Sequence, residues 1–347
     1  RKNSGITLPM LFPNADPAGV VPNFTFGSVA GWAANNNNRI TNFAGMPYNN
    51  RNPVYNITDN VTKLAGNHTV KVGIYYEFAV KSENPFRALN GAIDFSKDSN
   101  NPGDTNHPFA NALLGNFRSL TQTSASLLPE YPYHQYEWYA QDTWKVSRKL
   151  TLNYGLRWET QMPPTGLEDR WSDFSPTRPN PKAGNIPGAL IYAGDGAGRE
   201  GSRTLADGWY KGFGPRFGFA YKYDDKTVVR GSVGRSYGAV TTVSGSTHQR
   251  GFTQTYSVPD QGTNGILPNM ILRDGFPTYP VPPFIDPSFA NKDNIPWWQG
   301  NEATKLPTSD FFNLSIQRQL DSKMLVEVSY NASIGSHLQT QLLNYNQ

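Results

Sequence analysis

Histidine is the first side chain to examine for chemistry in this sequence, because imidazole ligates metals and transfers protons near neutral pH. The five histidines stand at positions 68, 107, 134, 248 and 337, and no two have the spacing of metal ligands. The chain contains no cysteine, which excludes thiolate metal sites and cysteine nucleophiles. We therefore expect no metal, no cofactor and no enzymatic activity.

Two glycine-rich segments are candidates for a phosphate or a cation. Gly212 and Gly214 are one residue apart, as in a phosphate-binding loop, but a strand pattern follows them where such a loop requires a helix. Residues 194–201 read GDGAGREG and lack the spaced carboxylates that calcium requires. The 31 basic residues are dispersed and the net charge is only +4, so we expect no nucleic-acid binding.

Charged residues also occur at alternate positions within apolar segments. Residues 136–159 read YEWYAQDTWKVSRKLTLNYGLRWE. After the turn in this segment, leucine and aromatic residues occupy every second position, which is the period of a strand with one apolar and one polar face. The same reasoning places five charged residues on polar faces: Arg157, Glu159, Arg216, Arg230 and Glu327.

Four hairpins share this construction, and their turns are predicted at residues 65–67, 147–149, 224–225 and 321–322. Two long segments rich in proline and glycine, 162–211 and 239–308, separate them. Long two-faced strands joined by tiny turns on one side and long loops on the other are typical of an outer-membrane β-barrel. A soluble sheet whose apolar face covers a core shows the same alternation.

Composition agrees with a barrel without requiring one. The mean hydropathy is −0.56, and no segment approaches the roughly 18 apolar residues of a membrane-spanning helix. Only every second residue of a barrel strand meets lipid, so a low mean hydropathy does not argue against a barrel. Aromatic residues make up 13% of the chain, which suits a protein with rings at two membrane interfaces.

The arrangement of loops fixes the expected topology. We predict short periplasmic turns and long extracellular loops, with further strands at 22–29, 91–96, 116–128 and 189–193 and a short helix at 108–115. The strands of the four hairpins together with these segments give a count of about 11 or 12. Counting strand directions then places the 96–116 connection, with its helix, on the periplasmic side. Residues 1–50 are expected to be mostly loop.

Aromatic residues fall into two predicted groups. Those in the long loops are candidates for stacking on an arriving sugar or peptide, although packing of the loops or a place in the interface belt is the favoured interpretation: Trp171, Trp209, Tyr210, Trp297 and Trp298. Those in the strands are assigned to the belts at the membrane interfaces: Trp138, Trp144 and Trp158.

At these hairpins the chain resembles TonB-dependent outer-membrane receptors. YAQDTWKVSRKLTLNYGLRWE is similar to the mid-barrel signature of that family, in which a Tyr-x-Gln-Asp strand turns into a Leu-Thr-Leu-x-x-Gly-Leu-Arg strand. GPRFGFAY with VVRGSVGRSYG, NLSIQRQL with VEVSYNASIGSHL, DNVTKLAGNHTVKVG and PFANALLG resemble the Oar-like subgroup. The resemblance covers roughly residues 55 to 340.

The resemblance implies import of a large solute across the bacterial outer membrane, driven from the inner membrane by the TonB complex. It also implies a barrel of about 22 strands, of which the 11 or 12 counted here are about half. An N-terminal plug closes such a barrel, and in Oar-like members a carboxypeptidase-regulatory-like domain precedes the plug. The chain shows no plug and no TonB-box-like segment, so we interpret residues 1–347 as a piece of a longer protein. The five charges on the polar faces would then face the plug, or simply line a wet lumen.

Two alternatives stay open on the sequence. A passive porin-like barrel would show the same strands without a plug. A soluble extracellular β-sandwich that binds a ligand would cover the apolar faces with a second sheet. The transported substrate, whether an oligosaccharide, a peptide or a siderophore-like compound, is not encoded in any motif of the chain.

Overall fold

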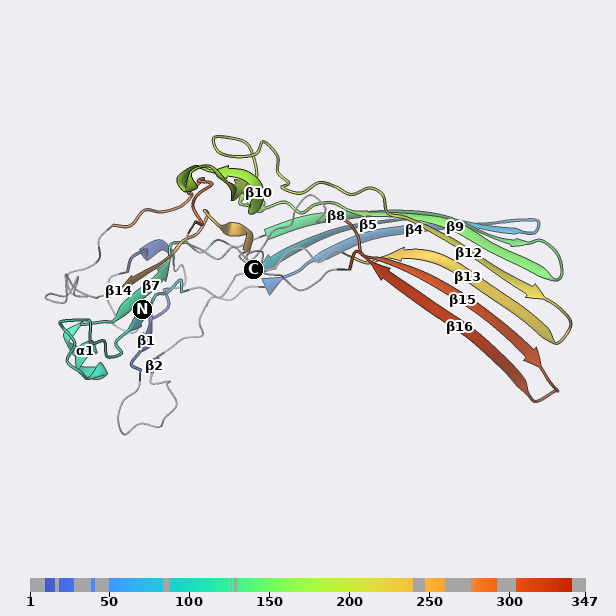
Figure 1. Cartoon of the computed structure of the whole chain (residues 1–347), viewed down its shortest axis with the longest axis horizontal. Coiled ribbons are helices and arrows are strands. Elements are labelled where there is room, and N and C mark those ends of the chain that lie inside the picture. The colour runs from blue at the N-terminus through green and yellow to red at the C-terminus, as the bar shows by residue number, and fades with distance from the viewer. Residues whose placement is uncertain are drawn as a thin grey trace.

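The structure is a computed structural model of the 347-residue chain. It describes residues 10–15, 19–27, 39–40, 50–83, 88–125, 127, 130–239, 247–259, 276, 278–291 and 304–338. Within them the protein has two regions, a large curved sheet of long strands and an assembly of loops and short elements (Figure 1).

The large sheet has nine strands and is here called the wall sheet. Its strands run antiparallel in the order β16-β15-β13-β12-β9-β8-β5, and both β4 and the short β3 pair with β5. The strands are β3 (Asn50–Arg51), β4 (Val54–Ala65), β5 (His68–Glu83), β8 (Glu130–Lys145), β9 (Leu150–Gln161), β12 (Phe213–Lys222), β13 (Thr227–Tyr237), β15 (Thr308–Gln319) and β16 (Leu325–Ser336). The eight long ones have 10 to 16 residues, which meets the roughly 9–11 that a tilted strand needs to cross a bilayer.

Four short connections lie together at one end of the wall sheet, here called the turn end (Figure 1). They join β4 to β5, β8 to β9, β12 to β13 and β15 to β16, as predicted from the four polar turns. In the first of them Gly66 has φ of 58°, a left-handed conformation that glycine adopts without a steric penalty. The three long connections leave from the opposite end, here called the loop end.

The two faces of the wall sheet differ as the alternation predicted. Cross-strand register places Val72, Ala140 and Leu156 side by side on one face, with Lys71, Gln141 and Gly155 on the other. The apolar face continues from β4 to β16, and many of its side chains are exposed, among them Ile57, Ile74, Trp138, Phe217, Leu314 and Val328. No helix or second sheet of the described chain covers this face, so it has the character expected of a surface in contact with lipid.

The wall sheet is not closed into a barrel. In the described residues, β4 with β3 forms one edge and β16 forms the other. Each edge strand presents a row of backbone groups that would pair with further strands in a closed wall. Among the described residues no helix has both the length and the apolar character needed to cross a membrane.

A second sheet lies beyond the loop end (Figure 1). Its order is β14-β7-β6-β1-β2, and its strands are β1 (Asn23–Thr25), β2 (Arg39–Ile40), β6 (Ala92–Asp94), β7 (Ser119–Thr123) and β14 (Thr255–Pro259). Helix α1 (Pro108–Leu114) lies beside it. Pro108 opens this helix and Gly115 closes it with φ of 78°, which matches the preference for proline at the start and glycine after the end. A core of Leu11, Phe12, Ile93, Phe95, Phe117 and Leu120 holds the sheet together.

The loops that follow β9 and β13 contain further short elements. They are the hairpin of β10 (Ser172–Asn180) and β11 (Ile186–Tyr192), and the 3-10 turns η2 (Leu167–Asp169), η3 (Pro181–Ala183) and η4 (Thr247–Gln249). The 3-10 turn η1 (Pro13–Ala15) lies before β1 in the chain. The two loops are joined to each other. Trp171 stacks on His248 with ring centroids 4.2 Å apart, and the Tyr192 hydroxyl donates to the Asp286 carbonyl at 3.0 Å. These contacts make the loop end a packed assembly.

Three predictions about topology are wrong. Segments 22–29, 91–96 and 116–128 contribute strands to the second sheet, and 189–193 lies largely in β11, so none of them adds to the wall sheet. In the part of the chain that the structure describes, the wall sheet has nine strands where 11 or 12 were expected. Helix α1 and the 96–116 connection lie at the loop end, opposite the place that the count of strand directions gave them (Figure 1). Alternation identifies a strand but does not say which sheet it joins, and β5 pairs directly with β8.

Candidate functional site

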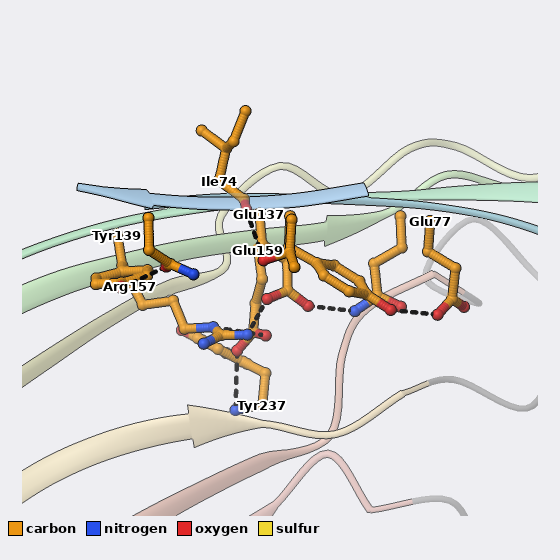
Figure 2. A network of polar contacts seen from close by, with 11 residues as sticks. Ile74, Glu77, Glu137, Tyr139, Arg157, Glu159 and Tyr237 are labelled. Atoms are coloured by element: carbon orange, nitrogen blue, oxygen red, sulfur yellow. Dashed lines mark hydrogen bonds and ion pairs between the residues drawn. The ribbon is translucent and has the colours of Figure 1, made fainter. Parts of the chain in front are cut away.

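The polar face of the wall sheet carries a charged network near the loop end (Figure 2). Its centre is Arg157 on β9, which contacts Glu137 on β8 and lies 3.5 Å from Glu159 on its own strand. The hairpin register explains the meeting. Glu137 is directly opposite Glu159, and Tyr139 is directly opposite Arg157. All of these side chains point away from Ile74, which lies on the apolar face of β5 (Figure 2).

Residues of β8, β5 and β13 make further hydrogen bonds beside this centre. Gln135 donates its side-chain N–H to Glu137 at 2.6 Å, and the Tyr75 hydroxyl donates to Glu77 at 2.5 Å. The backbone N–H of Tyr237, at the end of β13, donates to Glu159 at 3.2 Å. Glu137 and Glu159 are each only 8% exposed. Arg157, the Gln135 amide and the Tyr237 backbone N–H supply the compensation that these nearly buried carboxylates require.

A groove of about 830 Å³ lies next to this network on the same face. Its polar-face lining includes Tyr139, Asn153, Ser232 and Phe311, and its basic residues are Lys71, Arg157, Arg216 and Arg230. The single acidic residue along it, Asp142, hydrogen bonds to His68 and Tyr154 on the apolar side. Since Arg157 is matched by two glutamates, the excess positive charge of the groove comes from the other three basic residues.

The five predicted charged residues all lie on the polar face, but the structure brings only some of them together. Arg157 and Glu159 contact each other, and Arg216 and Arg230 line the groove. Arg230 donates to the Gln317 side chain at 2.5 Å. Glu327 on β16 is opposite Gln317 and lies outside the groove.

Sequence reasoning missed Glu137, Gln135 and Tyr75, although one signal was available. The turn at 147–149 is centred on residue 148, so a regular hairpin pairs residue 137 with residue 159. That register alone places a second carboxylate beside Arg157. Tyr75 takes part because β5 pairs with β8, and Tyr237 takes part because β13 ends near the open end of this hairpin. The local sequence encodes neither of these arrangements.

The loop aromatics separate into different environments. Trp171 is only 1% exposed, with Tyr131 against it edge-on and His248 stacked on it, so it is removed from the candidates for solute contact and acts as a packing anchor. Trp209 is half-buried against Tyr237, and Tyr210 is 52% exposed. Trp297 and Trp298 lie outside the described residues.

The three tryptophans assigned to the belts lie on the apolar face at two levels. Trp138 and Trp158 stack with ring centroids 6.4 Å apart near the loop end, and the Trp158 indole N–H donates to the Tyr210 carbonyl at 2.9 Å. Trp144 stacks on His68 at the turn end. Six residues of β8 separate Trp138 from Trp144, or about 20 Å along the strand. This spacing is that of rings at two levels of a membrane-facing surface.

A family comparison agrees with this architecture. Residues 1–347 match the outer membrane beta barrel domain family, and the chain belongs to this family. Its location is therefore the bacterial outer membrane. No curated protein matches the chain. Among solved structures, the chain is similar to the closed form of the ferric-catecholate import receptor Fiu from K12 E. coli, with 12% identity and a TM-score of 0.33. The match covers 81% of this chain and 31% of that receptor, so the chain spans about a third of the receptor's length.

Proposed function

We propose that this chain forms part of the barrel of a TonB-dependent receptor of the Oar-like kind, which takes up a large solute across the outer membrane. The observation that carries the proposal is the charged network on the polar face. Arg157 holds two nearly buried carboxylates in fixed positions, which makes a rigid polar surface next to a groove rich in unmatched positive charge. Such a surface is suited to hydrogen bonding with a plug that fills the barrel.

The proposed orientation places the turn end in the periplasm and the loop end outside the cell. Barrels of this membrane have short periplasmic turns and longer extracellular loops. The loop end supports this assignment because its connections form a packed assembly with a sheet and a core of its own. An arriving solute would meet this assembly first, and the exposed Tyr210 ring offers it an aromatic surface.

The proposed mechanism contains no catalytic step. The solute binds among the loops, the plug rearranges when TonB engages it, and the solute passes along the polar face, where Arg216 and Arg230 line the groove. Energy comes from the inner membrane through the TonB complex, and the solute is an oligosaccharide, a peptide or a siderophore-like compound.

The test compares uptake in cells that contain or lack TonB, with the protein produced at equal levels. Candidate oligosaccharides, peptides and siderophore-like compounds are supplied in labelled form, and accumulation is measured with and without a protonophore. The proposal expects accumulation of one class that depends on this protein, on TonB and on an energised inner membrane.

Two results would redirect the assignment. Passage that depends on the protein but is indifferent to TonB and to the protonophore would identify a passive porin-like barrel. A protein that stays in water without detergent, with its apolar face covered by a partner sheet, would be a soluble binding module.

A further inference from the structure

Positive charge is concentrated at the turn end of the wall sheet. The four turns and their flanking residues, 63–68, 145–150, 222–227 and 318–324, are here called the turn-end rim. The rim contains eight lysine and arginine residues and three aspartates. The whole chain has a net charge of +4, so the rest of the chain carries one more acidic than basic residue. The rim therefore accounts for the basic character of the protein.

Most of the basic side chains in the rim are exposed and have no acidic partner. Lys222 pairs with Asp225 at 2.6 Å, and Arg318 lies 3.8 Å from Asp224. Asp321 accepts backbone N–H groups within its own turn. The other six basic residues are exposed and form no ion pair with the described chain: Lys63, Lys145, Arg148, Lys149, Lys226 and Lys323.

Aromatic and apolar side chains lie directly next to these charges on the apolar face. Trp144 stacks on His68 one residue before the second turn, and Tyr221 and Tyr223 precede the third. Leu320 and Met324 flank the fourth turn and are half exposed. Rings and apolar groups bordered by cations form the amphipathic level at which lipid headgroups meet the hydrocarbon.

We propose that the turn-end rim binds the headgroups of anionic phospholipids in the periplasmic leaflet of the outer membrane. The proposal rests on the orientation given under the proposed function. Phospholipid is the occupant because the six unpaired cations are spread over all four turns, along the whole membrane-facing width of the sheet, and do not form one compact patch. Each lysine or arginine near an anionic membrane surface is attracted to it by about 1 kcal/mol, and this attraction does not require the residues to be adjacent.

The test uses the protein extracted from outer membranes and returned to phosphatidylcholine bilayers that contain one brominated lipid. In one set of bilayers the brominated lipid is phosphatidylglycerol, which is anionic. In the other set it is phosphatidylcholine, which is neutral. Bromine quenches tryptophan, and Trp144 reports on lipids at the rim because it lies on the apolar face at that level. Wild-type protein should show stronger quenching by the brominated anionic lipid than by the brominated neutral lipid. Raising the salt to about 0.5 M should remove the difference, because the exposed charges are then screened.

A matched pair of variants identifies the source of the preference. Arg148→Gln with Lys149→Gln removes two rim cations, and Lys97→Gln with Lys211→Gln removes two exposed cations from the loop end. The rim pair should weaken the preference for anionic lipid by about 25-fold, because each of the two lost cations contributes a factor of about five. The loop-end pair should retain the wild-type preference.

Three results would overturn the proposal. The first is equal quenching by the two lipids in the wild type, as expected if an acidic protein were the true partner of the rim. The second is an equal loss in both variant pairs. The third is a lipid preference that survives the rim substitutions, as expected if other residues bind the anionic lipid. The measurement involves neither TonB nor solute, so a passive barrel would contradict the proposed function and leave this result standing. Labelling of rim lysines in intact cells tests the orientation separately.

Discussion

Arg157 connects the two nearly buried carboxylates of the polar face, so its removal should lower the stability of the protein. Arg157→Gln leaves Glu137 with the Gln135 amide and Glu159 with one backbone N–H. A nearly buried carboxylate that loses its cation keeps its desolvation cost, so the free energy of unfolding should fall by about 2 kcal/mol. Urea unfolding of the protein in bilayers, followed by tryptophan fluorescence, measures the change.

Arg230→Gln is the control for this prediction. Arg230 lies on the same face, but it is exposed and its partner is the neutral side chain of Gln317. Its removal should cost less than about 0.5 kcal/mol, because exposed polar contacts contribute little. Equal losses in the two variants would show that the network does not act as a buried ion pair.

His248 makes the packing of the loops sensitive to acid. Its ring is stacked between Trp171 and the surrounding loop, and burial lowers its pKa from 6.5 to about 4. In the unfolded chain this histidine takes up a proton near pH 6.5. The neutral folded form therefore contributes stability that is complete above pH 6.5 and is lost as the pH falls to about 4. The contribution corresponds to about 3 kcal/mol.

The pH dependence of unfolding at the loop end tests this account. Wild-type protein should lose stability between pH 6.5 and 4, and His248→Phe should show a shallower loss, since phenylalanine cannot take up a proton. His107→Phe, which replaces an exposed histidine of the loop end, should behave like the wild type. The emission of the stacked Trp171 follows the transition. A steep loss that remains in His248→Phe would assign the acid sensitivity to other groups.

At the scale of the element, Gly155 explains why β8 and β9 approach so closely. A Cβ atom at this position would lie 2.7 Å from the Ala140 carbonyl oxygen and 3.0 Å from the Gln141 Cα, both of them backbone atoms of β8. Gly155→Ala should therefore separate the two strands at the centre of the network and lower the free energy of unfolding by about 1–3 kcal/mol. Thermal unfolding in bilayers gives the value.

The neighbouring glycine on the same face provides the comparison. At Gly218 on β12 a new Cβ would meet no atom closer than 3.4 Å, which is ordinary contact. Gly218→Ala should leave stability nearly unchanged or raise it slightly, since alanine restricts the unfolded chain more than glycine. The prediction is contradicted if both substitutions cost the same.

The hairpins were predictable because each encodes its own geometry. Alternation over ten or more residues around a polar turn predicted the strands, the turns and the residues that share a face, and apolar residues at helical spacing predicted α1. The second sheet was not predictable in this way. Its strands have three to five residues where they are described, except β2 with two, and β14 comes from a segment more than 130 residues away from its partner β7.

For the candidate site, too, the sequence predicted which residues share a face but not which of them make contact. The sequence placed Arg157, Glu159, Arg216 and Arg230 on one face, because parity within a strand is local information. Which of them meet depends on pairing between hairpins, and that separates Arg230, bonded to Gln317, from the network around Arg157. The burial of Trp171 depends on His248 from another loop, so its solvent-facing role could not be decided from its own segment.

At the scale of the whole molecule, the two faces of the wall sheet must meet different surroundings. Ala140 lies in the middle of the apolar face between Val72 and Leu156, and Gln141 is its neighbour on the polar face. In an outer-membrane protein, hydrocarbon covers the first residue, whereas the second faces the interior of the barrel. The same substitution at adjacent positions of one strand should therefore have very different costs.

Ala140→Arg should lower the free energy of unfolding in bilayers by about 2–4 kcal/mol, the cost of arginine near the midplane on a lipid-facing strand. Gln141→Arg adds a cation beside Lys71 on the wet side and should cost less than about 1 kcal/mol, because water and polar neighbours remain available. Both variants are compared in bilayers and in a detergent that lets the charged group reach water. A cost at position 140 that is the same in both media, or a larger cost at position 141, would mean that protein and not lipid covers the apolar face. The apolar face would then be a protein-packing surface and not a lipid-facing one, and the interpretation of the sheet as a barrel wall would lose its basis.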